Sequence, residues 1–75
     1  MKVYYDDEVD ALYLELGDET PEGVVEISEG VGLDTTSEGK LVGIEILKAS
    51  ERMDIKTILS YKLELDKEIV AQKIA

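Results

Sequence analysis

The stretch VEISEGVGLDTTSEGKLVGIEIL, residues 25–47, decides the fold of this 75-residue chain. Its apolar residues recur at every second position within each segment, at Val25, Ile27, Val31, Leu33, Val42, Ile44 and Ile46. Alternation of this kind predicts β-strands that carry one apolar face. We therefore expect three strands here, near residues 23–28, 30–36 and 41–47.

The first turn in this stretch supports an antiparallel pairing. A three-residue loop ending at Gly30 would pair Ile27 with Val31. It would also pair Val25 with Leu33, so that the apolar side chains share one face. Such a loop needs a left-handed residue at its last position, which glycine adopts easily.

The second turn, which contains Gly39, gives the same result. Pairing Leu33 with Ile44 and Val31 with Ile46 again keeps one face apolar, and it implies a loop of two or four residues. A slip of one residue would turn the whole strand over, so the register is well specified.

The N-terminal segments extend the pattern to about five strands. Segments 2–5 and 11–16 alternate in the same way, and face matching pairs Tyr5 with Leu12 and Val3 with Leu14. Because short turns join all of these segments, the expected sheet is an antiparallel β-meander.

The C-terminal third changes period. Apolar residues at helical spacing predict a helix near 51–60, capped by Ser50 or Asp54 and packed on one face of the sheet. A short second helix near 66–74 is favoured, although residues 61–65 alternate like a strand. The fold class is thus α+β, in a single domain over residues 1–75.

Composition excludes several kinds of function. The chain has no cysteine and no histidine, which removes thiolate metal sites, disulfides and the usual general base. No apolar run is long enough to span a membrane, and no signal peptide precedes the first strand, so we expect a cytoplasmic protein. The absence of Asn, with abundant Glu and Lys, is weakly typical of thermophiles.

Charge is concentrated in the first half of the chain. Residues 1–38 hold twelve acidic residues against one base, a net of −11, and the remainder carries +1, giving the overall −10. This field repels phosphate, which argues against nucleic-acid and membrane partners. It fits a basic protein partner, or it only keeps the protein soluble.

Four carboxylates cluster in residues 6–10, between the first two strands. Three of them, Asp6, Glu8 and Asp10, match alternate ligand positions of a calcium loop, but the glycine at position six and the glutamate at position twelve are missing. We therefore interpret the cluster as a turn in which Asp6 accepts a backbone amide, with Asp10 contributing less. The alternative is a small enzyme, or a ligand- or divalent-metal-binding protein, that uses these carboxylates.

The face opposite the apolar row is not cleanly polar. It carries exposed apolar and aromatic residues that form a candidate interface: Tyr4, Tyr13, Val24, Leu41 and Leu47. Such a patch indicates self-association, and a homodimer is the commonest form. Gly32 and Gly43 share this face, where they either admit a close neighbour or ease the twist of the sheet.

Three segments carry a family resemblance: MKVYYDDEVDALYLEL (1–16), EISEGVGLDTTSEGKLVGIEILKAS (26–50) and ERM (51–53). They resemble the small prokaryotic domain of unknown function 2283, over residues 1–53, with residues 54–75 as an extension. The resemblance implies a small sheet with one helix and an uncharacterised role, and it supplies no catalytic residues to carry over. By analogy it also implies an antitoxin-like role against a small toxin-like partner.

The sequence thus favours a non-catalytic protein–protein interaction module that forms a homodimer. Its structural turn residues are Asp6, Asp10, Gly30 and Gly39, and it has no predicted catalytic, cofactor or metal site.

Overall fold

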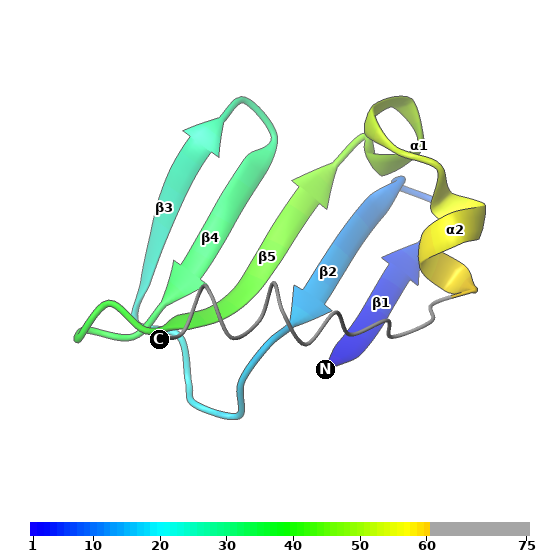
Figure 1. Ribbon diagram of the computed structural model, residues 1–75. Coiled ribbons are helices and arrows are strands. Elements are labelled where there is room, and N and C mark those ends of the chain that lie inside the picture. Colours follow the sequence, from blue (N-terminus) through cyan, green and yellow to red (C-terminus); the bar gives the residue numbers. More distant parts are fainter. Residues whose placement is uncertain (61–75) are drawn as a thin grey trace, which may run out of the picture.

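The computed structural model describes residues 1–60 of the chain. Within them a five-stranded antiparallel sheet is followed by two short helices, which confirms the predicted α+β class (Figure 1). The elements are β1 (Lys2–Asp6), β2 (Ala11–Glu15), β3 (Gly23–Ser28), β4 (Val31–Thr35), β5 (Leu41–Leu47), α1 (Ala49–Arg52) and α2 (Ile55–Leu59). The predicted second helix near 66–74 lies outside the described residues.

The order of the strands differs from the prediction. The sheet runs β1-β2-β5-β4-β3, so β5 lies between β2 and β4 and the sheet is not a simple meander. Figure 1 shows the link after β2 passing below the sheet to reach β3 at the far edge. Matching of apolar faces could not give this order, because every strand has the same alternation. The prediction therefore rested on the assumption that strands adjacent in the sequence pair with each other.

The registers of β1 with β2 and of β4 with β5 agree with the prediction. Tyr5 pairs with Leu12 and Val3 with Leu14. Leu33 pairs with Ile44, as predicted. Face matching therefore fixed which side chains share a face.

The hairpin between β3 and β4 contains a correction. Val25 pairs with Leu33 as expected, but Ser28 rather than Ile27 pairs with Val31. Ile27 is an extra residue in a β-bulge, and the turn is shortened to Glu29 and Gly30. Gly30 has φ of 80°, so it adopts the left-handed conformation that the sequence required.

The hairpin between β4 and β5 also contains a bulge, between Asp34 and Thr35. The amide of Thr36 donates to the carbonyl of Lys40 at 2.9 Å, leaving three residues in the loop instead of two or four. The bulge accounts for the difference of one residue between the predicted and the observed loop length. Gly39, in this loop, has φ of 88°.

The expected helix over 51–60 is divided into α1 and α2. Met53 has extended backbone angles (φ −155°, ψ 166°) and ends α1. Asp54 then begins α2, and its side chain accepts the amide of Lys56 at 3.0 Å. A polar capping residue placed in the middle of the predicted helix thus starts a new one.

The core of the described residues is small and lies over β2 and β5. Leu12 and Ala49 are completely buried, and Val42 is 4% exposed. Leu12 pairs with Ile46 of β5, so the two central strands carry the core while the outer strands remain open. No helix among residues 1–60 has the length and apolarity to cross a membrane.

Candidate functional site

Asp10, in the acidic turn between β1 and β2, is a structural anchor. Its backbone is left-handed, with φ of 54°. Its carboxylate accepts the Tyr5 hydroxyl at 2.7 Å, the Ser50 hydroxyl at 2.6 Å and the Ser50 amide at 3.0 Å. The Asp10 carbonyl also accepts the amide of Ala49 at 3.0 Å. Asp10 therefore ties the β1–β2 turn to the first residues of α1.

These contacts shift two pKa values in opposite directions. The hydrogen bonds from Ser50, and then that from Tyr5, lower the pKa of Asp10. The hydrogen bond to Asp10, together with burial, raises the pKa of Tyr5. The lowered pKa favours the charged form of Asp10, and the raised pKa favours the neutral form of Tyr5.

Asp6 lies where the sequence placed it, but it makes fewer contacts than Asp10. Among the described residues, its side chain accepts one hydrogen bond, from the Glu8 amide at 3.0 Å. These hydrogen bonds argue against the expectation that Asp10 contributes less than Asp6 to stability, which mutation of the two residues tests. The sequence could not show them, because the partner of Asp10, Ser50, lies forty residues away in the chain.

The carboxylates of the 6–10 turn do not converge. Within the first sixty residues, no three potential metal ligands lie together. Asp10 accepts protein donors on both of its oxygens. This geometry is that of a turn and does not resemble a calcium loop, whose ligands surround one point.

Two tyrosines and two carboxylates lie on the face opposite the apolar row. Tyr4 donates to Glu15 and Tyr13 donates to Asp34, each at 3.0 Å. The two rings lie 6.4 Å apart between centroids, at an angle of 43°. Burial, and then the bond to Asp34, raise the pKa of Tyr13.

Gly43 is required by the position of Tyr13. A methyl group at Gly43 would overlap the hydroxyl and the ring of Tyr13. At Gly32 the nearest atom, Cγ1 of Val24, is 3.4 Å away, which is an ordinary contact. Of the two explanations for these glycines, close approach of a side chain thus applies to Gly43.

The five candidate interface residues, Tyr4, Tyr13, Val24, Leu41 and Leu47, differ in their surroundings. Tyr4 is half exposed and adjoins Tyr13, which is largely engaged within the sheet. Val24 and Leu47 line a shallow hollow of about 180 Å³ that also includes Gly32. Leu41 is 42% exposed, at the start of β5.

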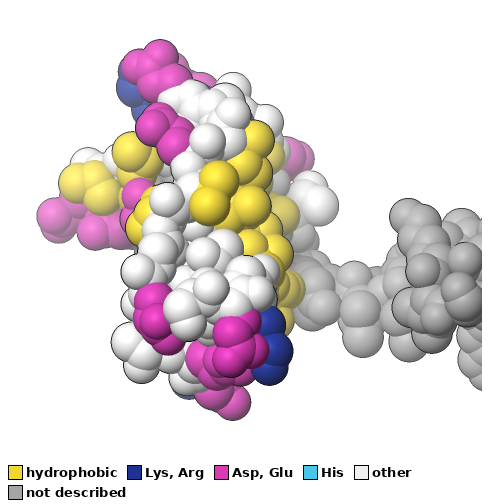
Figure 2. Space-filling model, turned by 90° about the vertical axis from the view of Figure 1, so that its left-hand side faces the viewer, with side chains coloured by type: hydrophobic (Ala, Val, Ile, Leu, Met, Phe, Trp, Pro, Cys, Tyr) yellow, Lys and Arg dark blue, Asp and Glu magenta, His cyan; other side chains and the backbone are white. Residues whose placement is uncertain are grey.

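Sequence reasoning did not identify β3 as an exposed edge. All six of its residues are exposed, including Val24 at 71%, Val25 at 53% and Ile27 at 61%. Seen from the β3 side, hydrophobic side chains form a strip along one flank of the sheet, with acidic side chains near both ends (Figure 2). The sequence shows that β3 is rich in apolar residues. Its position at the edge of the sheet follows from the strand order, which the sequence did not show.

Sequence reasoning also did not identify Arg52. Its guanidinium donates to the carbonyl of Leu47 at 3.1 Å and to that of Glu29 in the β3–β4 turn. One side chain of α1 thus holds together the end of β5 and the tip of the hairpin. A planar group with several donors is suited to such a double contact.

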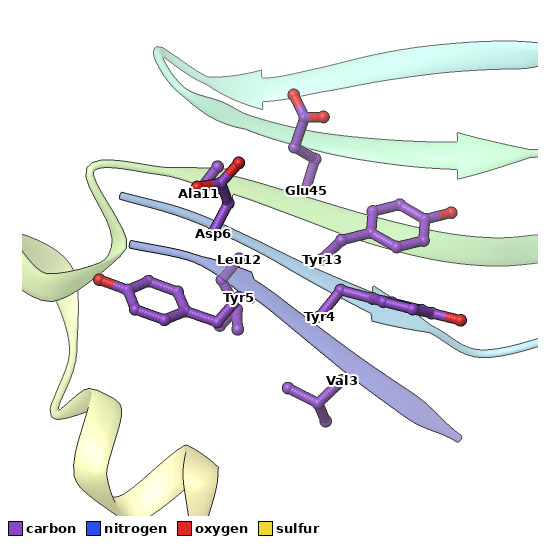
Figure 3. A pocket seen from close by; sticks show the side chains of 8 residues that line it. All are labelled: Val3, Tyr4, Tyr5, Asp6, Ala11, Leu12, Tyr13 and Glu45. Carbon is purple, nitrogen blue, oxygen red and sulfur yellow. The ribbon is translucent and has the colours of Figure 1, made fainter. Parts of the chain in front are cut away.

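A hollow of about 450 Å³ lies around β1 and β2. Figure 3 shows that its lining side chains come from both faces of the sheet: Tyr4 and Tyr13 on one side, Tyr5 and Leu12 on the other. An active site usually brings polar groups together inside one cleft. This hollow is an open margin of the sheet.

Comparison with known protein families gives a match. A family model described as a protein of unknown function (DUF2283) matches residues 2–50 of the 75-residue chain. No curated protein and no solved structure matches the chain. The match covers the five strands that the structure describes and the beginning of α1, including Asp10 and Ser50. The chain therefore belongs to the DUF2283 family of proteins of unknown function.

Proposed function

We propose that this protein is a non-catalytic protein–protein interaction module that associates with itself as a homodimer. The observation that carries the proposal is the exposure of β3, where Val24, Val25 and Ile27 are all more than half exposed. Apolar side chains gathered on one exposed element are typical of interfaces. The test is the mass in solution by light scattering, where a dimer would have twice the 8.3 kDa of one chain.

The alternative of a carboxylate enzyme or metal-binding protein has less support. Asp10, the most contacted carboxylate of the 6–10 turn, is held by Tyr5 and Ser50. A catalytic pair of carboxylates needs one member kept protonated by its surroundings, whereas the pKa of Asp10 is lowered. A rise in melting temperature with millimolar calcium or magnesium, abolished by Asp10→Asn, would favour the alternative.

We also propose that any second partner is a basic protein, in a relation similar to that of an antitoxin and its toxin. The support is the net charge of −11 over residues 1–38, which contain β1 to β4. Charge of one sign over a surface accelerates the arrival of a partner of the opposite sign. The proposed complex would form in the cytoplasm.

The experiment for this partner is a pull-down at low salt from the source organism, followed by binding rates over a salt series. Association should slow markedly as salt rises to physiological strength, where the screening length falls to about 8 Å. Dissociation should change less. If the captured proteins are acidic or neutral, or if the association rate does not depend on salt, the acidic surface serves solubility alone.

A further inference from the structure

The outer edge of β3 has a definite hydrogen-bonding pattern. The amide of Leu47 donates to the carbonyl of Gly30, so Gly30 and the alternate residues of β4 after it bond to β5. The residues between them, which include Leu33, bond to β3, and Leu33 pairs with Val25. Since backbone groups alternate in direction along a strand, Val24 and Glu26 point their N–H and C=O groups outward.

No segment among the described residues lies along this edge (Figure 1). Natural sheets protect their edges with charged side chains, especially lysine, and with proline or bulges. The segment Gly23–Glu26 contains no lysine or proline, its one charged residue is Glu26, and it pairs regularly with β4. The bulge at Ile27 comes after it. Within residues 1–60, the outer side of this short segment is therefore open to another strand.

We propose that β3 pairs antiparallel with β3 of a second copy, centred on Val25, so that the two sheets join into one. This inference rests on the proposed self-association and specifies the surface through which the two copies associate. The register follows from charge and from the backbone. A two-fold axis through Val25 places Val24 opposite Glu26 of the other copy, and these are the residues whose backbone groups point outward.

The two neighbouring registers of the β3–β3 pair place acidic side chains opposite each other. A centre at Val24 places Glu22 opposite Glu26 of the second copy, and a centre at Glu26 places the two Glu26 side chains opposite each other. Like charges directly opposite are destabilising. The Val25 register has no acidic residue opposite another. It also brings the two Val25 side chains together at a position without backbone hydrogen bonds, where side chains are closest.

The test uses single-cysteine variants, because the chain has no cysteine of its own. In this register the two residues at position 25 are directly opposite, with Cα atoms about 4.5 Å apart, a spacing that a disulfide can bridge. Those at position 24 are diagonal neighbours, about 7–8 Å apart. Under mild oxidation, Val25→Cys should shift to a covalent dimer while the more exposed Val24→Cys stays monomeric.

A second measurement uses the unaltered chain. Amide exchange of Val24 and Glu26, followed by NMR as the concentration rises, should slow as the dimer forms, while the inward amide of Val25 changes little. The Val25→Lys variant should be monomeric by light scattering, and Val25→Thr should still associate.

The outcomes separate this inference from the proposed function. Preferential cross-linking of Val24→Cys or Glu26→Cys would overturn the Val25 register. A dimeric mass without cross-linking at position 25, and without protection of the two amides, would overturn the inference but leave self-association standing. A monomer at every concentration would overturn both.

Discussion

At the residue scale, Gly43 shows how one missing side chain determines the position of another. The Tyr13 ring occupies the space above Gly43, and its hydroxyl reaches Asp34 on β4. The sequence could place both residues on the same face. It could not show their contact, because that contact depends on β2 and β5 being neighbours, which the predicted meander excluded.

Replacing Gly43 by alanine should therefore destabilise the protein by about 1–3 kcal/mol, the usual cost of overpacking. Urea unfolding measures the effect, and Gly32→Ala is the matched control on the same face, where the nearest atom is 3.4 Å from the added group. Combining Gly43→Ala with Tyr13→Ala should cost less than the sum of the two single changes. Equal losses for the two glycine variants would show that Tyr13 does not occupy this space.

Asp10 provides a pH-dependent prediction at the same scale. Because its pKa is lowered in the folded protein, its contribution to stability is present above its unfolded pKa and is lost as pH falls through the folded value. Asn also tolerates the left-handed backbone. Asp10→Asn should thus be less stable than the unaltered protein at neutral pH, and the difference should narrow in acid.

Thermal unfolding from pH 7 downward checks this, with Asp7→Asn as a control at an exposed neighbour in the same turn. A difference between Asp10→Asn and the unaltered protein that stays constant over the whole range would contradict the role assigned to the carboxylate.

At the element scale, alternation and turn chemistry predicted where strands begin and which faces they share. They could not give the order of strands, since each strand suits several neighbours equally. They also missed both bulges, because an extra residue is tolerated where it leaves the apolar face intact, as Val25 opposite Leu33 and Leu33 opposite Ile44 show. The one sign in the sequence that the helix divides at Met53 was Asp54, a residue suited to capping a helix.

The link between α1 and the β3–β4 hairpin can be tested through Arg52. Arg52→Lys should lose the double contact to the carbonyls of Leu47 and Glu29, because an ammonium group cannot reproduce the planar fork of the guanidinium. We expect faster amide exchange at the hairpin tip, around Gly30, while exchange in the β1–β2 pair stays unchanged. Lys56→Arg, on the exposed side of α2, is the control. Unaltered exchange at the tip would show that Arg52 does not brace it.

At the scale of the whole molecule, the family and the α+β class could be predicted from the sequence. The candidate interface stays a prediction. Tyr4 and Tyr13 form hydrogen bonds within the sheet, and the proposed β3 surface includes Val24 from the predicted residues. Because the buried core of the described residues is small, association would add apolar burial that one copy lacks.

The net charge of −10 determines how self-association should respond to salt. Two copies of an acidic chain repel each other, and salt screens this repulsion. Self-association should therefore strengthen as salt rises, while binding to a basic partner should weaken. The opposite responses distinguish the two kinds of complex in the same buffer series.

Sedimentation equilibrium of the unaltered chain, over concentrations from tens of micromolar upward and over a salt series, tests the central claim most directly. The proposed homodimer predicts a mass that rises with concentration towards twice 8.3 kDa, and that reaches it at lower concentration in higher salt. A mass of 8.3 kDa at every concentration and every salt would contradict the claim that this protein associates with itself.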